Sequence, residues 1–223
     1  MTMRTLLALA AILLSGAARP RDWTATVTAT PAGAYVLGNP QARVKLVEYA
    51  SYTCNHCAAF SRESDAVLKG RMIRSGSTSL EVRHIVRDSL DLSAAILARC
   101  TGRQRFFATS AAIFAAQDDW LARGAQFQQL NGSHLALYSQ TDQLRVLADG
   151  SGLTALVKAR GLSEPAVAAC FADDAGIARI TAMTAAAPRD IPGTPTFYIN
   201  GRIVPRTASW SALEPALRTA GAK

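Results

Sequence analysis

Residues 44–57 read VKLVEYASYTCNHC, and this stretch is the strongest indication of the fold. Val44 to Tyr49 are mostly apolar and β-branched, which predicts a buried strand. From Cys54 to about Arg74 the pattern is helical, and Ser75-Gly76-Ser77 ends it. A second strand is predicted over Leu80 to Val86. A strand, a helix and a strand joined by a connection this long predict a parallel pair and an α/β fold.

The middle of the chain, residues 88–187, has a different character. It is rich in alanine, with large apolar residues at helical spacing, and it predicts four or five helices beginning near Ser89 and no strand. Strand character returns at Thr196–Ile199. Asn200-Gly201 then predicts a hairpin, because both turn positions need positive φ. We therefore expect one discontinuous α/β domain, 23–87 and 188–222, interrupted by an all-helical domain.

Two predictions concern the flanks of this domain. Trp23 to Thr28 alternates large or β-branched residues with small ones and predicts a short strand, while Pro31 to Pro40 is typical of turns. Ser209 to Ala220 predicts a closing helix.

Residues 1–18 have the pattern of a signal peptide. Arg4 precedes an uncharged apolar run from Leu6 to Leu14, and small residues near Ala17-Ala18 offer a cleavage site. The alternative is an uncleaved membrane anchor, but the run is short against the roughly 20 apolar residues that span a bilayer. We expect export to the periplasm or an equivalent oxidising compartment, where disulfides persist.

The composition indicates a folded globular protein, with 49% hydrophobic and 18% charged residues. The formal net charge is +8, yet the basic residues are scattered and not interleaved with aromatic ones. We therefore expect no nucleic-acid partner. The charge is interpreted as a solvated surface that could dock to anionic membranes or acidic partners.

The chemistry is expected at Cys54-Asn55-His56-Cys57. A thiolate at a helix N-terminus meets unpaired backbone N–H groups and the positive end of the helix dipole, which lower its pKa. Cys57, one turn deeper, could attack a mixed disulfide on Cys54, and the His56 side chain could further stabilise the thiolate. The alternatives are half of a zinc site, for which no second ligand pair stands nearby in sequence, and a structural disulfide.

Glu48 lies six residues before Cys54, near the end of an otherwise apolar strand. A carboxyl group there would lie beneath the cysteine pair, with a pKa raised by desolvation, and could accept the proton of Cys57. The alternative is a solvated acid at the end of a strand.

Two further features stand apart in the sequence. The Thr194–Pro195 bond directly precedes a strand, and both a cis bond and an ordinary trans loop are compatible with that position. Cys100 and Cys170 both lie in predicted helices of the insertion. In an oxidising compartment they suggest a structural disulfide, and the alternative is two buried reduced thiols.

Together, VKLVEY, SYTCNHC, the Gly193–Phe197 segment GTPTF and Asn200-Gly201 resemble the DsbA-like branch of the thioredoxin superfamily. The resemblance implies a thioredoxin fold with an inserted helical domain. It implies a cis Thr194–Pro195 bond facing the cysteines, with Thr194 offering its backbone to the substrate chain. It also implies an exposed nucleophile at Cys54, a buried resolving thiol at Cys57 and a buried acid at Glu48.

The resemblance implies an exported thiol–disulfide oxidase that introduces disulfides into reduced or unfolded exported proteins. It uses no cofactor or metal beyond the Cys54–Cys57 pair, and a DsbB-like, quinone-linked membrane protein would reoxidise it. The alternatives are a reductase or isomerase of the same fold and a peptide-binding chaperone. We expect a monomer, since too few residues precede Val44 for the dimerisation domain of similar bacterial isomerases.

Overall fold

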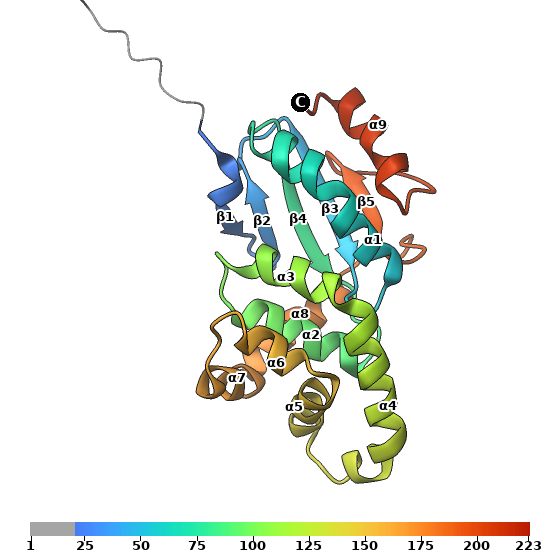
Figure 1. Cartoon of the computed structure of the whole chain (residues 1–223). Coiled ribbons are helices and arrows are strands. Elements are labelled where there is room, and N and C mark those ends of the chain that lie inside the picture. The colour runs from blue at the N-terminus through green and yellow to red at the C-terminus, as the bar shows by residue number, and fades with distance from the viewer. Residues whose placement is uncertain (1–20) are drawn as a thin grey trace, which may run out of the picture.

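The computed structural model describes residues 21–223, so the predicted signal peptide lies outside the described residues. A mixed six-stranded sheet has the order β1-β2-β4-β3-β5-β6 and forms one part of the molecule, with a helical part beside it (Figure 1). The strands are β1 (Val27–Ala29), β2 (Tyr35–Gly38), β3 (Val44–Ala50), β4 (Thr78–His84), β5 (Thr196–Ile199) and β6 (Arg202–Ile203).

β3 lies at the centre of the sheet because its side chains are buried along most of its length. It pairs in parallel with β4, where Leu46 lies opposite Leu80, and antiparallel with β5, where Glu48 lies opposite Phe197. Both neighbours therefore bring apolar side chains to the strand that leads into the cysteine motif.

The helix after the cysteine motif forms as two segments, α1 (Asn55–Ser64) and the π-helical η2 (Asp65–Ile73). Phe60 of α1 packs on Phe197 of the sheet, with ring centroids 4.6 Å apart, and against Trp210. Trp210 begins α9 (Trp210–Ala220), which lies near α1 in Figure 1. This aromatic contact fixes α1, and therefore the cysteines at its start, against β5.

The inserted part contains more helices than the sequence predicted. Seven occupy 89–185 instead of four or five, because the alanine-rich sequence hides short breaks such as Gly152, which adopts φ 85° between two of them. The helices are α2 (Ser89–Cys100), α3 (Phe106–Ala115), α4 (Gln117–Leu135), α5 (Gln140–Ser151), α6 (Leu153–Lys158), α7 (Glu164–Phe171) and α8 (Asp174–Ala185).

The region before β3 also differs from the prediction. Trp23–Ala25 form the 3₁₀ helix η1 instead of a strand, and β1 begins at Val27. The stretch expected to be turns contains β2, which pairs with β4 through Tyr35 opposite Val82. A four-residue strand between turn residues carries too short an alternating pattern to be distinguished in the sequence.

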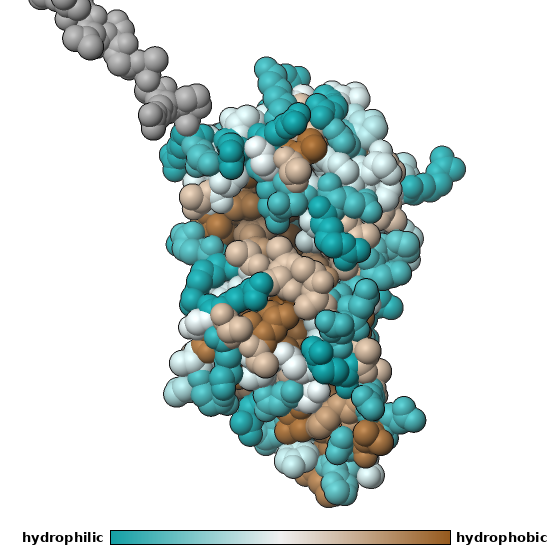
Figure 2. All heavy atoms as spheres, in the orientation of Figure 1, coloured by the Kyte–Doolittle hydropathy of each residue, from teal (hydrophilic) through white to brown (hydrophobic). Residues whose placement is uncertain are grey.

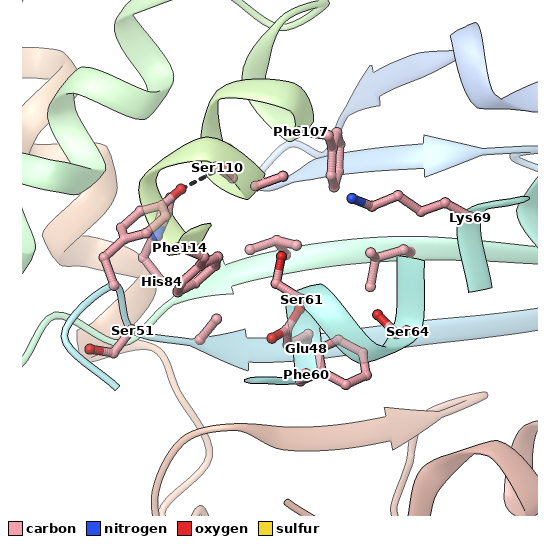
Figure 3. A pocket seen from close by; sticks show the side chains of 15 residues that line it. Glu48, Ser51, Phe60, Ser61, Ser64, Lys69, His84, Phe107, Ser110 and Phe114 are labelled. Atoms are coloured by element: carbon pink, nitrogen blue, oxygen red, sulfur yellow. Dashed lines mark hydrogen bonds between the residues drawn. The ribbon is translucent and has the colours of Figure 1, made fainter. Parts of the chain in front are cut away.

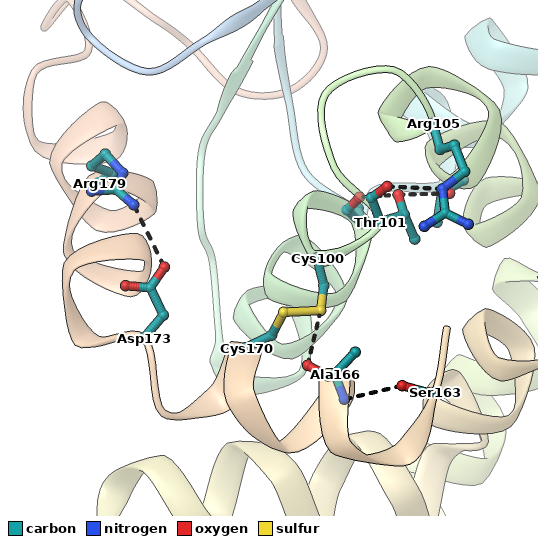
Figure 4. Close-up of a disulfide and its surroundings, with 10 residues drawn as sticks. Cys100, Thr101, Arg105, Ser163, Ala166, Cys170, Asp173 and Arg179 are labelled. Atoms are coloured by element: carbon teal, nitrogen blue, oxygen red, sulfur yellow. Dashed lines mark hydrogen bonds and ion pairs between the residues drawn. A yellow bond between two sulfur atoms is a disulfide. The ribbon is translucent and has the colours of Figure 1, made fainter. Parts of the chain in front are cut away.

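A disulfide joins Cys100 at the end of α2 to Cys170 in α7 (Figure 4). Their Cα atoms lie 5.8 Å apart, within the ordinary range for such bridges. The two cysteines left outside the CNHC motif are therefore paired, and the bridge holds two helices of the insertion together. Across residues 21–223, no helix has both the length and the apolar character needed to cross a bilayer.

Candidate active site

Cys54 is the N-cap residue of α1, directly after the loop that follows β3. Its backbone is extended and no side chain caps the helix, so the sulfur occupies the place of a capping group. In its thiol form, the Cys54 Sγ atom donates to the Thr194 carbonyl oxygen at 3.0 Å. The CNHC motif and the segment before Pro195, 140 residues apart in sequence, therefore meet at one sulfur atom.

The surroundings of Cys54 favour its thiolate. A hydrogen bond from the Cys57 thiol lowers the pKa of Cys54 most, and partial desolvation opposes this effect. Hydrogen bonds from the Thr194 side chain and from the backbone N–H groups of Cys57 and His56 lower the pKa further, to about 5. The two backbone donors belong to the open first turn of α1. At neutral pH, Cys54 is thus a thiolate and a good leaving group.

Cys57 has the opposite character. It is completely buried, and burial raises its pKa well above the usual value, helped by its hydrogen bond to Cys54 and by the nearby Glu48 carboxylate. The two sulfurs of one motif therefore differ strongly in acidity. The outer one holds negative charge and the inner one holds a proton.

Glu48 lies beneath the pair on β3 and is 5% exposed. Burial raises its pKa to about 8, with the charge of Cys54 contributing, while the Lys69 ammonium opposes the shift. Its Oε1 atom is buried and has no hydrogen-bond partner among the described residues. A carboxyl group with this pKa can both take up and give back a proton near neutral pH.

The Glu48 side chain borders a small cavity of about 40 Å³ between the sheet, α1 and α3 (Figure 3). His84 Nε2 lines the same cavity and also has no partner within the described residues. Burial lowers the pKa of His84 to about 3, so its imidazole is neutral. The cavity is large enough for a water molecule, although most of its lining is apolar.

The Thr194–Pro195 bond is cis, the geometry that the family resemblance implies. Beside it lies an open groove of about 380 Å³, formed by the 190–196 segment and by residues 203–208 after the hairpin. Thr196 secures the segment by donating to the Gly193 carbonyl oxygen at 2.6 Å. Thr194 lines this groove and its carbonyl oxygen meets Cys54 Sγ, so the groove lies close to the sulfur.

One expectation from the sequence needs correction, and a second stays a prediction. Cys54 is only 4% exposed, where the resemblance implied an exposed nucleophile, because the segment before Pro195 lies over its sulfur. The His56 side chain is exposed and makes no hydrogen bond. Its backbone N–H helps to lower the pKa of Cys54, and a contribution of the side chain to the thiolate stays a prediction.

The loop before Cys54 is held by two buried side chains of the helical insertion that the sequence did not reveal. The Asp91 carboxylate of α2 accepts from the Ser51 hydroxyl at 2.6 Å and from the Tyr52 N–H at 2.8 Å. Gln117, the first residue of α4, donates to the carbonyl oxygens of Tyr52 at 2.6 Å and Cys54 at 3.0 Å. An ordinary Asp and Gln in helical sequence give no signal of this role.

The described residues contain no group of three or more His, Cys, Asp or Glu side chains placed to hold a metal ion. What the site does contain is a pair of thiols of unequal acidity, a titratable buried carboxyl group and an open groove. These parts suit thiol–disulfide exchange.

Comparison with known proteins agrees with this chemistry. Residues 30–218 match the family described as Thioredoxin. The chain is 31% identical to a protein-disulfide isomerase of Novosphingobium aromaticivorans, with a TM-score of 0.76 over 83% of this chain and 96% of that one. It is 27% identical to a variant of alpha-DsbA1 of Wolbachia pipientis, with a TM-score of 0.58 over 74% of this chain and 73% of that one.

Curated relatives include a "Putative protein-disulfide oxidoreductase" of Rickettsia conorii, 32% identical over 169 residues, which are 74% of this chain and 53% of the relative. The chain spans about half the length of the curated relatives that it matches. The chain belongs to the thioredoxin family. Within it, the chain is a DsbA-like protein, with a helical domain inserted in the thioredoxin fold.

Proposed function

We propose that this protein is an exported thiol–disulfide oxidase that transfers a disulfide from its Cys54–Cys57 pair to reduced exported proteins. The observation that carries the proposal is the unequal acidity of the two thiols, with the pKa of Cys54 lowered to about 5 and that of Cys57 raised. An oxidant must have a stable reduced form, and a stable Cys54 thiolate supplies that stability.

The reaction begins with the pair in its disulfide form. A substrate thiolate attacks Cys54 Sγ, the bond between Cys54 and Cys57 breaks, and Cys57 leaves as a thiolate that takes a proton from Glu48. A second substrate thiolate then attacks the substrate sulfur of the mixed disulfide and releases the Cys54 thiolate. The substrate loses two electrons and gains a disulfide, and the cysteine pair gains the two electrons.

Three groups have distinct roles in these steps. Glu48 exchanges the proton of Cys57, for which its pKa of about 8 is suited. The backbone of Thr194, whose carbonyl oxygen already meets Cys54, pairs with the substrate chain in the groove beside Pro195. The first turn of α1 stabilises the leaving Cys54 thiolate.

The proposed setting is the periplasm or another oxidising compartment, reached after cleavage of residues 1–18. The proposed partners are reduced or unfolded exported proteins and a DsbB-like, quinone-linked membrane protein that restores the disulfide. We propose that the protein acts as a monomer and needs no cofactor or metal beyond its cysteine pair.

The reduction potential of the Cys54–Cys57 pair, measured against a glutathione series, tests the proposal. We expect a value near the roughly −120 mV typical of DsbA, together with a thiolate absorbance that titrates near pH 5. A value near the roughly −270 mV of thioredoxin would contradict the oxidase assignment.

A reductase or isomerase is the second candidate, and the likeness to a structure named protein-disulfide isomerase favours it. The two candidates differ in their products. An oxidase converts a reduced substrate with several cysteines to disulfide forms without added glutathione, whereas an isomerase accelerates the reshuffling of a scrambled, fully oxidised substrate.

A further inference from the structure

One end of the molecule carries a concentration of exposed positive charge that the redox chemistry does not use. We call it the basic end, and it consists of six exposed residues from separate parts of the chain: Arg21, Arg43, Lys45, Arg71, Arg202 and Lys223. In Figure 1 this is the end at which the C-terminus is marked, and in Figure 2 hydrophilic residues make up much of the surface there, as they do elsewhere on this face.

Backbone contacts bring these segments together. Lys45 at the start of β3 exchanges hydrogen bonds with Asn200 in the turn before Arg202. The Lys223 N–H donates to Ser77 Oγ at 2.9 Å, just after η2. The Arg43 side chain lies against Gly221 at the end of α9. The positive side chains therefore share one end of the sheet, where β3 and β4 begin.

The charge at this end is not neutralised within the protein. None of the six residues forms an ion pair with another residue of the 21–223 range. Two acidic residues near this end, Asp22 and Glu214, are already paired with Arg74 and Arg218. An uncompensated cluster of this kind attracts a negatively charged surface.

The basic end lies opposite the redox site. Cys54 follows the carboxyl end of β3, whereas Lys45 lies at its amino end. The seven residues of β3 separate the two by about 20 Å at roughly 3.3 Å a residue. A surface bound at the basic end would leave the cysteine pair and its groove open to solvent.

We propose that the basic end docks this protein on an anionic phospholipid surface. Membranes rich in anionic lipid attract clusters of basic residues through diffuse charge, without a shaped pocket. The half-buried Trp23 lies at the same end with Arg21 stacked on its ring at 4.0 Å, and tryptophan is favoured at membrane interfaces. Single-stranded nucleic acid is usually bound on several stacked aromatic side chains, and this end offers one ring.

Docking would orient the protein with its redox site toward soluble substrates. A membrane-embedded oxidant would then have to reach the pair with a segment outside the bilayer. The inference rests on charge and geometry alone, so it can fail while the proposed redox function stands, and the reverse also holds.

Vesicle co-sedimentation of the full chain tests the docking. Vesicles of phosphatidylcholine alone are compared with vesicles containing phosphatidylglycerol, at low and high salt. The test variant carries R43Q, K45Q, R71Q and R202Q, whose side chains make no hydrogen bond or ion pair in the structure. The matched control carries four equivalent changes elsewhere: R103Q, R145Q, R160Q and R189Q.

We expect wild-type affinity to rise with phosphatidylglycerol content and to fall with salt, because counterions screen exposed charges. The basic-end variant should lose at least tenfold in affinity for anionic vesicles, and the control variant should stay within about threefold of wild type. An equal loss in both variants would overturn the proposal, since net charge alone would explain the binding. So would tighter binding to a duplex oligonucleotide than to the anionic vesicles. Urea unfolding and thiol–disulfide activity of both variants confirm that each is folded.

Discussion

Replacing Glu48 by glutamine should make the protein more stable and less active. Glu48 is buried and its pKa is raised to about 8, mainly by desolvation. In the unfolded chain the pKa is near the ordinary glutamate value of 4.5. The folded state therefore binds the proton more tightly, and the stability that protonation contributes is fully present below about pH 4.5. It is lost as the pH rises from 4.5 to 8.

The size of the effect follows from these two values. At pH 7, a carboxyl group with a pKa of about 8 when folded and 4.5 when unfolded lowers the free energy of unfolding by about 3 kcal/mol, relative to a group that stays neutral. Glu48→Gln removes this term while keeping the shape of the side chain. The gain is an upper value, since the glutamine amide also needs a hydrogen-bond partner in the same buried place.

Urea unfolding at pH 5 and at pH 8 measures the prediction, with both proteins treated with the same reductant. The stability advantage of E48Q should be small at pH 5 and should grow toward pH 8. The exposed Glu63→Gln on α1 is the control and should show no such trend. An advantage of E48Q that does not change with pH would refute the argument.

The same variant should slow the exchange step in which Cys57 leaves or attacks, because glutamine cannot transfer its proton. The rate of substrate oxidation should fall at neutral pH, with little change in substrate affinity. Greater stability combined with slower chemistry would mark Glu48 as a residue kept for function.

Three further changes test other parts of the site. Replacing Cys100 and Cys170 together by alanine opens a crosslink that spans 70 residues and should lower the free energy of unfolding by up to about 4 kcal/mol in urea titrations, with the reduction potential unchanged. Gln117→Leu leaves the buried Tyr52 carbonyl oxygen unpaired, at about 1–3 kcal/mol, while the Cys54 carbonyl oxygen keeps its bond from the Ala58 N–H; the loosened loop should raise the pKa of Cys54 as followed by thiolate absorbance. Thr194→Val removes a side-chain hydrogen bond to Cys54, so it should raise that pKa and make the reduction potential more negative, in titration against glutathione.

The parts of the fold that sequence predicted are those with strong local patterns. The buried strand before Cys54 and the Asn200-Gly201 hairpin both formed, the latter with positive φ at both residues. The strand β2 was missed because four residues between turns carry too little pattern. The helix count in the insertion was too low because alanine is favourable on either side of a break.

Some residues of the candidate site could likewise be predicted from the sequence, and others could not. Cys54, Cys57 and Glu48 could be identified because their roles follow from spacing along one strand and one helix. The role of the His56 side chain could not be judged, since its direction depends on the packing around the first turn of α1. The roles of Asp91 and Gln117 could not be predicted from the sequence, because their contacts with the loop before Cys54 form only when the insertion packs against that loop.

Those two residues change how the helical insertion is understood. The loop between β3 and α1 has few hydrogen-bond partners of its own, and an unsupported N-terminus would let Cys54 lose the donors that lower its pKa. Asp91 anchors the loop at the Tyr52 N–H, and Gln117 anchors it at the Tyr52 and Cys54 carbonyl oxygens. The strand β3 and the helix α1 position the Cys54 sulfur and the N–H groups that stabilise its thiolate. Side chains of α2 and α4 hold the loop between these two elements in place. The insertion therefore supports the loop that positions Cys54.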